Sequence, residues 1–442
     1  MGTLVMKFGG TSVGSVEALT SAVDIVMQYK DEWQRLVVVV SAMAGVTNAL
    51  IEAARSAERG DAERYKQIHT ELLERHGDVI ETLVKSAEVR QSLLAQVEEM
   101  LEGFANARVV AALLRERSAE SEAVDATQLI VTDDRFQDAV PKREVTCKLV
   151  RKHLEPLLKK GLIPVVTGFI AATEDGATTP LGRGGSDYTA AILGDCLDAD
   201  EVWTWTDVDG VMSADPRLVA GARVIPKLSY NEVSELAYFG ARVLHPKTIR
   251  PIVERGIPLW VKNTFNPEVP GTLVVADPKN GNGNIKAVTA IENLSMITVQ
   301  GMGMLGVPGI AARTFAAVAR QGVSVLMISQ ASSEQSICFI IPMEAVAQVM
   351  AAVEDELAVE LARRDVDKVW SMDDVVIVSA VGAGLRSTPG IAARIFGALG
   401  RAQINVVAIA QGSSECSLSF LVGAGDAAQA VQSIHEEVIV NG

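Results

Sequence analysis

The feature that most constrains the fold is an internal repeat in the last third of the chain. VPGIAARTFAAVARQGVSVLMISQASSEQSICFII, which begins at Val307, matches TPGIAARIFGALGRAQINVVAIAQGSSECSLSFLV, which begins at Thr388. The offset is constant, so Pro308 corresponds to Pro389. Each copy has the pattern of a strand, a helix preceded by proline and glycine, a strand, a turn and a strand. A duplicated unit of this kind predicts two small α+β domains of one fold.

The order within each copy is the βαββ order of a ferredoxin-like domain. The proline and glycine place a helix N-terminus next to a turn, and such a terminus attracts a carboxylate. We therefore expect a site for a small zwitterionic ligand at this end of the helix. A purely structural dimerisation module is the alternative interpretation.

A glycine-dense turn, TTPLGRGGSDYT, runs from Thr178 to Thr189. It carries one cation, Arg183, then Ser186 and Asp187, and an apolar helical run follows at once. Glycines let backbone amides approach an anion closely, and the helix N-terminus adds positive potential. The turn therefore predicts an anion site, although it lacks the GxxxxGK[ST] pattern of a Walker A loop. A tight connection capped by Ser186 or Asp187 is the alternative.

Two further strand–turn–helix segments lie near the N-terminus. In TLVMKFGGTSV, Lys7 ends a strand and is followed by Gly9 and Gly10, a second anion cradle at the edge where open α/β sheets bind ligands. In RLVVVVSAMAGVTNAL, a buried parallel strand ends in small and hydroxylated residues that include Ser41 and Thr47. A solvated lysine and a simple capped turn are the competing interpretations.

An acidic stretch, DADEVWTWTDVDGVMSADPR, follows the glycine-dense turn. A strand leads into Thr206, Asp207, Asp215 and Arg217, which could hold Mg²⁺-bound water or the donors of a ribose and adenine. Turn chemistry alone could also explain its aspartates and glycines. The turn-rich DPKNGNGN, near residues 277–286, predicts a linker between domains.

Composition sets the class. The chain has 442 residues, 48% hydrophobic and 21% charged, which predicts a globular protein of two or three domains. Its net charge of −15 argues against a nucleic-acid partner. We expect no signal peptide, no membrane span and a cytoplasmic location. The four cysteines lack metal-ligand spacing, as do the five histidines, so we expect reduced, buried cysteines and no protein-held metal.

The sequence resembles the aspartate kinase family of the amino-acid kinase superfamily. The motifs occur in family order over essentially the whole chain, and they are KFGGTSV, SAMAGVTN, TGF, LGRGGSDYTA, WTDVDGV, DPR and GARVLHPKT. The paired repeats resemble tandem ACT domains. The resemblance implies an α/β/α sandwich around an eight-stranded, mainly parallel sheet, followed by two ferredoxin-like ACT domains. It implies a catalytic domain over 1–280 and ACT domains over 291–365 and 372–442, where the last strand could complete the first ACT domain.

The same resemblance implies an enzyme that transfers the γ-phosphoryl group of ATP, with Mg²⁺ held mainly by phosphates and water, to the side-chain carboxylate of L-aspartate. The catalytic residues would be Lys7, Arg183 and Asp187. The aspartate site would comprise Ser41, Thr47, Phe169, Arg183, Ser186 and Asp187. The nucleotide site would comprise Lys7, Gly9, Gly10, Thr206, Asp207, Met212, Asp215, Arg217 and Arg242.

Two departures from the family pattern bear on activity. Relatives carry a Gly-Glu-x-x-Ser segment whose glutamate contacts aspartate, and the corresponding EEMLEGFANARVVAALL is shorter and contains no such motif. Glu102 precedes Gly103 there instead. Pro180 stands where relatives often have a threonine, which removes a hydroxyl and an N–H beside the glycine-dense turn.

The ACT pair implies a homo-oligomer and feedback inhibition by lysine or threonine, through Gln330, Asn405 and Gln411. The QASSE and NVVAIAQGSSE segments of the repeats resemble the ACT domains of bifunctional aspartate kinase–homoserine dehydrogenases, and this resemblance favours threonine as the inhibitor. We nevertheless expect no dehydrogenase domain within the 442 residues. Two alternatives remain. One is another amino-acid kinase, such as a glutamate 5-kinase, and the other is a catalytically impaired amino-acid sensor.

Overall fold

The computed structural model describes residues 2–99, 104–135, 139–240, 244–276, 285–304, 307–330, 335–385, 388–411 and 416–441. The chain divides into two compact units. The first comprises Met1–Val211, Val224–Ser234 and Arg242–Pro278, and the second comprises Met212–Arg223, Glu235–Ala241 and Lys279–Gly442. Among the described residues no helix is both long and apolar enough to cross a membrane.

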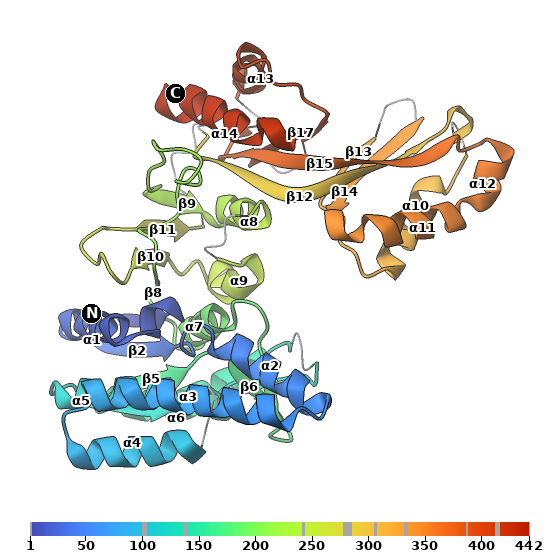
Figure 1. Ribbon diagram of the computed structural model, residues 1–442. Helices are drawn as coiled ribbons and strands as arrows, with labels where there is room; N and C mark the ends of the chain where they lie inside the picture. The colour runs from blue at the N-terminus through green and yellow to red at the C-terminus, as the bar shows by residue number, and fades with distance from the viewer. Residues whose placement is uncertain are drawn as a thin grey trace. The chain divides into compact units, whose positions relative to one another are not determined.

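The first unit is built on an eight-stranded sheet in the order β3-β5-β2-β1-β8-β10-β11-β9 (Figure 1). Every neighbouring pair is parallel except β10 and β11. The predicted mainly parallel, eight-stranded sheet is therefore confirmed. The strands are β1 (Thr3–Phe8), β2 (Arg35–Val40), β3 (Ser121–Val124), β5 (Ile163–Thr167), β8 (Glu201–Thr206), β9 (Lys227–Ser229), β10 (Leu259–Asn263) and β11 (Thr272–Val275).

Helices cover both faces of this sheet because its central strands are apolar on both sides. Leu4, Met6 and Phe8 of β1 belong to a core shared with α1 (Val16–Tyr29) and α5 (Phe104–Glu116). The alternate residues of β1 face α7 (Gly185–Cys196), which packs on β1 and β8, while α6 (Arg143–Lys159) packs on β5. The remaining elements are α2 (Val46–Glu58), α3 (Ala62–Leu83), α4 (Ala87–Glu99), α8 (Tyr230–Tyr238), α9 (Pro246–Arg255) and a small sheet of β4 (Val131–Thr132), β6 (Ile170–Thr173) and β7 (Thr178–Pro180).

The departure at Pro180 is accommodated by its position in the fold. Pro180 ends β7, which lies at the edge of the small sheet and pairs only with β6. An edge strand tolerates a residue that lacks an N–H, because one side of the strand has no ladder to supply.

The second unit holds the sequence repeat on one six-stranded antiparallel sheet, in the order β13-β14-β12-β15-β17-β16. The first copy comprises β12 (Ala287–Gln300), α10 (Ile310–Arg320), β13 (Met327–Gln330), β14 (Ser336–Pro342) and α11 (Val346–Glu356), followed by α12 (Ala358–Arg363). The second comprises β15 (Lys368–Val381), α13 (Ile391–Arg401), β16 (Ala408–Ala410), β17 (Ser417–Gly423) and α14 (Ala427–His435), followed by a π-helical turn, Glu436–Val440. The predicted strand–helix–strand–strand order is confirmed in both copies.

The two copies match in detail. Phe315 packs edge-on against Phe339 at 5.6 Å, and the corresponding Phe396 packs against Phe420 at 5.9 Å. The glycine before each helix has a positive φ, as an L side chain would rarely allow. The last strand of the chain, β17, pairs with β15 and β16, so it lies in the second copy and does not complete the first.

The expectation of four reduced, buried cysteines is wrong for one pair. Cys147 of α6 and Cys196 of α7 form a disulfide, with their Cα atoms 4.7 Å apart. Of the other two cysteines, Cys416 is buried and Cys338 is half-buried. The pair is separated by 49 residues, and no short spacing in the sequence reveals that α6 and α7 bring these two positions together.

Stability should depend on pH through His76, a buried residue of α3 whose Nδ1 lies 2.7 Å from the carbonyl oxygen of Leu72. Burial lowers the pKa of His76 below its ordinary value of 6.5. Between the lowered value and 6.5 the unfolded chain binds more protons than the folded chain, so the free energy of unfolding falls as the solution is acidified through this window.

We expect the melting temperature of the native protein to fall more steeply between about pH 7 and pH 5 than that of His76→Gln, because the variant lacks this titration. Thermal melts across this range measure the difference. Gln67→Ala, a change at an exposed position of the same helix that removes no titratable group, serves as the control and should retain the native slope. Equal slopes for the native protein and His76→Gln would contradict the assignment.

Candidate active site

The centre of the candidate site is an ion pair between a strand and a helix of the first unit. Lys7 Nζ lies 2.7 Å from Asp187 Oδ1, and the side chains of Lys7 and Asp187 are 9% and 15% exposed. Lys7 alternates with the core residues Met6 and Phe8, so it projects from the opposite face of β1, toward α7. Asp187 stands in the first turn of α7, where a carboxylate complements the helix dipole. Two residues predicted from separate motifs therefore meet.

Close packing fixes the first turn of α7 against the turn after β5. A Cβ on Gly168 would lie 2.6 Å from Ser186 Oγ, and a Cβ on Gly185 would lie 2.7 Å from a ring carbon of Phe169. Phe169 itself has φ of 80°, in the left-handed region that non-glycine residues seldom occupy. Its backbone N–H donates to Thr189 Oγ1 at 3.2 Å. The structure thus brings Phe169 and Ser186 together beside Asp187.

The turns after β1 and β2 are joined by backbone hydrogen bonds. Ser41 N donates to the carbonyl oxygen of Phe8 at 3.1 Å, and Ala44 N donates to that of Gly10 at 3.0 Å. A Cβ on Gly10 would lie 3.1 Å from the carbonyl oxygen of Ala42, so glycine lets these turns approach. Gly9 N donates to the carbonyl oxygen of Trp205 at 3.1 Å, which joins the first turn to β8.

Two side chains that the sequence analysis did not single out support these turns. Arg75 of α3 donates to the carbonyl oxygens of Ala44 at 2.7 Å and Gly14 at 3.0 Å. Asn106 of α5 donates from Nδ2 to the carbonyl oxygen of Ser41 at 2.9 Å, and it is buried. All three contacts link positions more than thirty residues apart, so no local pattern signals them.

Three other residues predicted to bind substrate are more exposed to solvent. Thr47 lies in the first turn of α2 and is exposed. Arg183 is exposed in the turn before α7, and Ser41 is half-buried. Glu102 and Gly103, which mark the shortened segment, lie outside the described residues, as does Arg242.

The predicted nucleotide stretch continues from β8. Thr206 ends β8, and its Oγ1 donates to Asp207 Oδ1 at 3.1 Å. Met212, Asp215 and Arg217 belong to the second unit, and Arg217 lies 2.6 Å from Asp215. The side-chain hydrogen bond from Arg217 lowers the pKa of Asp215. Trp205, the residue before Thr206, pairs with Phe8 of the neighbouring strand. Their rings stack with centroids 6.1 Å apart.

The second unit contains a cavity of about 310 Å³ at the start of α10. It is lined by Met304, Val307, Pro308, Gly309, Ile310, Ala311, Gln330 and Ile337. Gln330, one of the predicted effector residues, lines this cavity at the N-terminus of the repeat helix α10. Gln411 follows β16, and Asn405 follows α13; both are exposed.

Within the described residues, Cys147, Asp195 and Cys196 form a group whose ligand atoms lie within 4.8 Å of one another. The two sulfurs are bonded to each other, and the Asp195 carboxylate pairs with Arg143 and Arg255. A carboxylate held by two guanidinium groups next to a disulfide is a poor ligand set for a cation.

Comparison with known proteins agrees with this architecture. The model of the amino acid kinase family matches residues 2–263, and that of the ACT domain matches residues 297–357 and 378–438. Fold and site thus define a protein of the amino acid kinase class with two ACT domains. The chain is 33% identical to lysine-sensitive aspartokinase 3 of Escherichia coli, over 98% of this chain and 99% of that protein.

It is also 36% identical to a bifunctional aspartokinase/homoserine dehydrogenase of Haemophilus influenzae and 35% identical to one of Zea mays, in each case over 99% of this chain. The chain spans 56% and 50% of these two proteins, about half the length of the bifunctional relatives it matches. Among solved structures, E. coli aspartokinase III in complex with aspartate and ADP superposes with a TM-score of 0.76 at 29% identity, over 99% of both chains. The chain belongs to the aspartokinase family.

The packing of Gly168 against Ser186 gives a stability prediction. Gly168→Ala should lower the free energy of unfolding by about 1–3 kcal/mol, because the added methyl overlaps Ser186. Gly77→Ala, in helix α3, is the matched control, because a Cβ there would meet Leu94 of α4 at an ordinary contact distance of 3.8 Å. Alanine at this helical position should raise the free energy of unfolding by about 0.5–1 kcal/mol. Urea unfolding of both variants measures the contrast. Equal effects would show that the turn adapts without cost.

Proposed function

We propose that this protein is an aspartate kinase, which transfers the γ-phosphoryl group of ATP to the side-chain carboxylate of L-aspartate to give 4-phospho-L-aspartate. The observation that carries the proposal is the Lys7–Asp187 pair, held at 2.7 Å at the C-terminal edge of β1 beside glycine turns. Phosphoryl transfer depends mainly on positioning and on stabilisation of charge, and this edge of the sheet supplies both.

Each residue takes a role that suits its chemistry. Lys7 neutralises charge on the phosphoryl group as it moves, and Asp187 binds the substrate ammonium. Arg183, exposed in its turn, is free to clamp a substrate carboxylate in a bidentate manner. The remaining contacts to aspartate come from Ser41, Thr47, Phe169 and Ser186.

For the nucleotide we propose Lys7, Gly9, Gly10, Thr206, Asp207, Met212, Asp215, Arg217 and Arg242. The carboxylates of this stretch are mostly engaged, because Asp209 accepts from Asn263 at 2.7 Å and Asp215 pairs with Arg217. This arrangement fits a Mg²⁺ ion held mainly by phosphate oxygens and water, with Asp207 as the nearby exposed acid. Mg²⁺ would neutralise charge on the nucleotide phosphates.

We further propose a catalytic domain over residues 1–280 and ACT domains over residues 291–365 and 372–442. The ACT pair would bind a feedback inhibitor, with threonine favoured over lysine, and would form a homo-oligomer. Support for the oligomer comes from Ile328 and Ile409, which occupy equivalent edge strands of the two copies and are 49% and 48% exposed. The reaction would be the first step of aspartate-family amino-acid synthesis, in the cytoplasm.

The first test is aspartate-dependent release of ADP from Mg-ATP. Lys7→Met should lower kcat by about 10²–10³-fold, the usual loss when one stabilising charge is removed from a transition state. Lys159→Met removes an exposed lysine of α6 whose side chain is 78% exposed, and it should leave kcat unchanged. Tight aspartate binding without ADP release by the native protein would instead favour an amino-acid sensor, and turnover of glutamate alone would favour another amino-acid kinase.

The effector site is tested with inhibitor titrations. If the cavity at the start of α10 binds the feedback amino acid, Gln330→Ala should raise the concentration for half-inhibition by about tenfold, the value of a lost hydrogen bond to a charged group. Gln321→Ala, at the other end of α10, is the control and should behave like the native protein. Unchanged inhibition in Gln330→Ala would place the effector elsewhere.

A further inference from the structure

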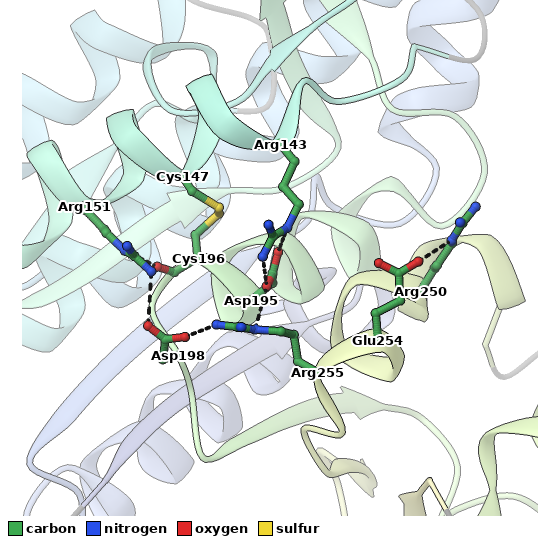
Figure 2. Close-up of polar contacts among 9 residues, drawn as sticks. All are labelled: Arg143, Cys147, Arg151, Asp195, Cys196, Asp198, Arg250, Glu254 and Arg255. Carbon is green, nitrogen blue, oxygen red and sulfur yellow. Dashed lines mark hydrogen bonds and ion pairs between the residues drawn. A yellow bond between two sulfur atoms is a disulfide. The ribbon is translucent and has the colours of Figure 1, made fainter.

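A stripe of three residues on α6 faces the C-terminal end of α7. Arg143, Cys147 and Arg151 recur every fourth residue, so they lie on one side of the helix. Figure 2 shows their side chains directed toward Asp195 and Cys196, the last two residues of α7. The centre of the stripe is the Cys147–Cys196 disulfide, and an arginine stands one turn away on each side of it.

Ion pairs hold the same two helix ends together independently of the sulfur bridge. Asp195 is 3% exposed, and it accepts from Arg143 Nε at 2.6 Å and from Arg143 Nη2 at 2.8 Å. Arg255, the last residue of α9, forms an ion pair with the same carboxylate, with its Nε 3.1 Å from Asp195 Oδ1. A buried carboxylate with two guanidinium partners is strongly tied to its place.

The segment just beyond α7 is tied in the same way. Arg151 donates from Nε to the carbonyl oxygen of Cys196 at 2.8 Å and pairs with Asp198 at 3.1 Å. Arg255 pairs with Asp198 as well (Figure 2). Because these contacts involve no sulfur, they remain when the disulfide is reduced, and they keep the two thiols adjacent for reoxidation.

We propose that Cys147 and Cys196 are a reversible thiol–disulfide site in the folded enzyme, which fastens the distal end of the helix that carries Asp187. The two sulfurs differ in access, since Cys147 is half-buried on α6 whereas Cys196 is 1% exposed. An incoming thiolate therefore attacks the Cys147 sulfur and releases Cys196 as a thiolate. The Asp195 carboxylate lies within 4.8 Å of both sulfurs and disfavours a thiolate, and its ion pairs with Arg143 and Arg255 offset that negative charge.

The oxidation step balances with a low-molecular-weight disulfide as the oxidant. The Cys147 thiolate attacks one sulfur of this disulfide and forms a mixed disulfide with it, while the small-molecule S–S bond breaks and its other half leaves as the first small thiol. The Cys196 thiolate then attacks the Cys147 sulfur, forms the protein S–S bond and releases the second small thiol. Two protein thiols are oxidised, one small disulfide is reduced to two thiols, and the two protons of the protein thiols end on those products.

The site bears on catalysis through the length of α7. This helix runs for 12 residues from Gly185, and Ser186 and Asp187 lie in its first turn while Cys196 is its last residue. The bridge adds a covalent restraint to the end of α7 that the ion pairs of Asp195 already hold, so its reduction should loosen this short helix only in part. The effect on substrate rests on the proposed function: with the bridge reduced, we expect a larger KM for aspartate and little change in kcat.

The chemical test needs no activity. The native protein is equilibrated in buffers of reduced and oxidised glutathione, free thiols are blocked with an alkylating agent, and peptides are mapped by mass spectrometry. Cys147 and Cys196 should titrate together as one two-electron pair. The oxidised form should melt about 5 °C or more above the reduced form, because the bridge closes a loop of 49 residues.

Cys147→Ser should abolish this thermal difference, whereas Cys338→Ser, which removes the half-buried free cysteine, should retain it. The proposal is overturned if both thiols stay alkylatable in every buffer, if the bridge is reduced only when the protein unfolds, or if the reduced pair retains a stoichiometric metal ion. If the pair titrates but the KM for aspartate is the same in both forms, the proposed effect of the disulfide on the substrate site is wrong. If neither form turns over, the proposed function is rejected, and the reversible disulfide remains supported by the alkylation data.

Discussion

A lysine and an aspartate that are both largely withdrawn from water can coexist only as a pair, and much of the first unit serves to hold Lys7 and Asp187 at 2.7 Å. The position of Lys7 requires β1 to lie between β2 and β8, since both neighbours fix its register. The position of Asp187 requires α7 to pack on β1 and to start directly after the glycine turn. Sheet order and helix start are therefore linked through one ion pair.

The turns around this pair show how packing takes over where local patterns end. Positions 168 and 185 favour glycine, because the side chains of Ser186 and Phe169 occupy the space that a Cβ would fill. Arg75 of α3 and Asn106 of α5 donate hydrogen bonds to backbone carbonyl oxygens in these turns, which lie outside the strands. The site is thus supported by helices that carry none of the recognisable motifs.

The sequence was most informative where structure is local or repeated. Strand, turn and helix around Lys7, the glycine-dense turn and both βαββ copies follow from hydrophobic pattern and glycine placement, and the structure confirms them. It was least informative about contacts between distant positions. The bridge between Cys147 and Cys196 depends on how α6 and α7 cross, and the membership of Met212 and Arg217 in the second unit depends on tertiary packing. Neither leaves a short-range signal.

The continuous sheet of the second unit has a consequence for how the repeat could evolve or be engineered. The two copies meet along β12 and β15, each 14 residues long, and these strands form the centre of the six-stranded sheet. If either copy were deleted, the long central strand of the other would become a bare edge with unpaired amides and carbonyls, ready to pair with another chain. Each copy therefore protects the long central strand of the other, and loss of one copy would expose a new edge in the copy that remains.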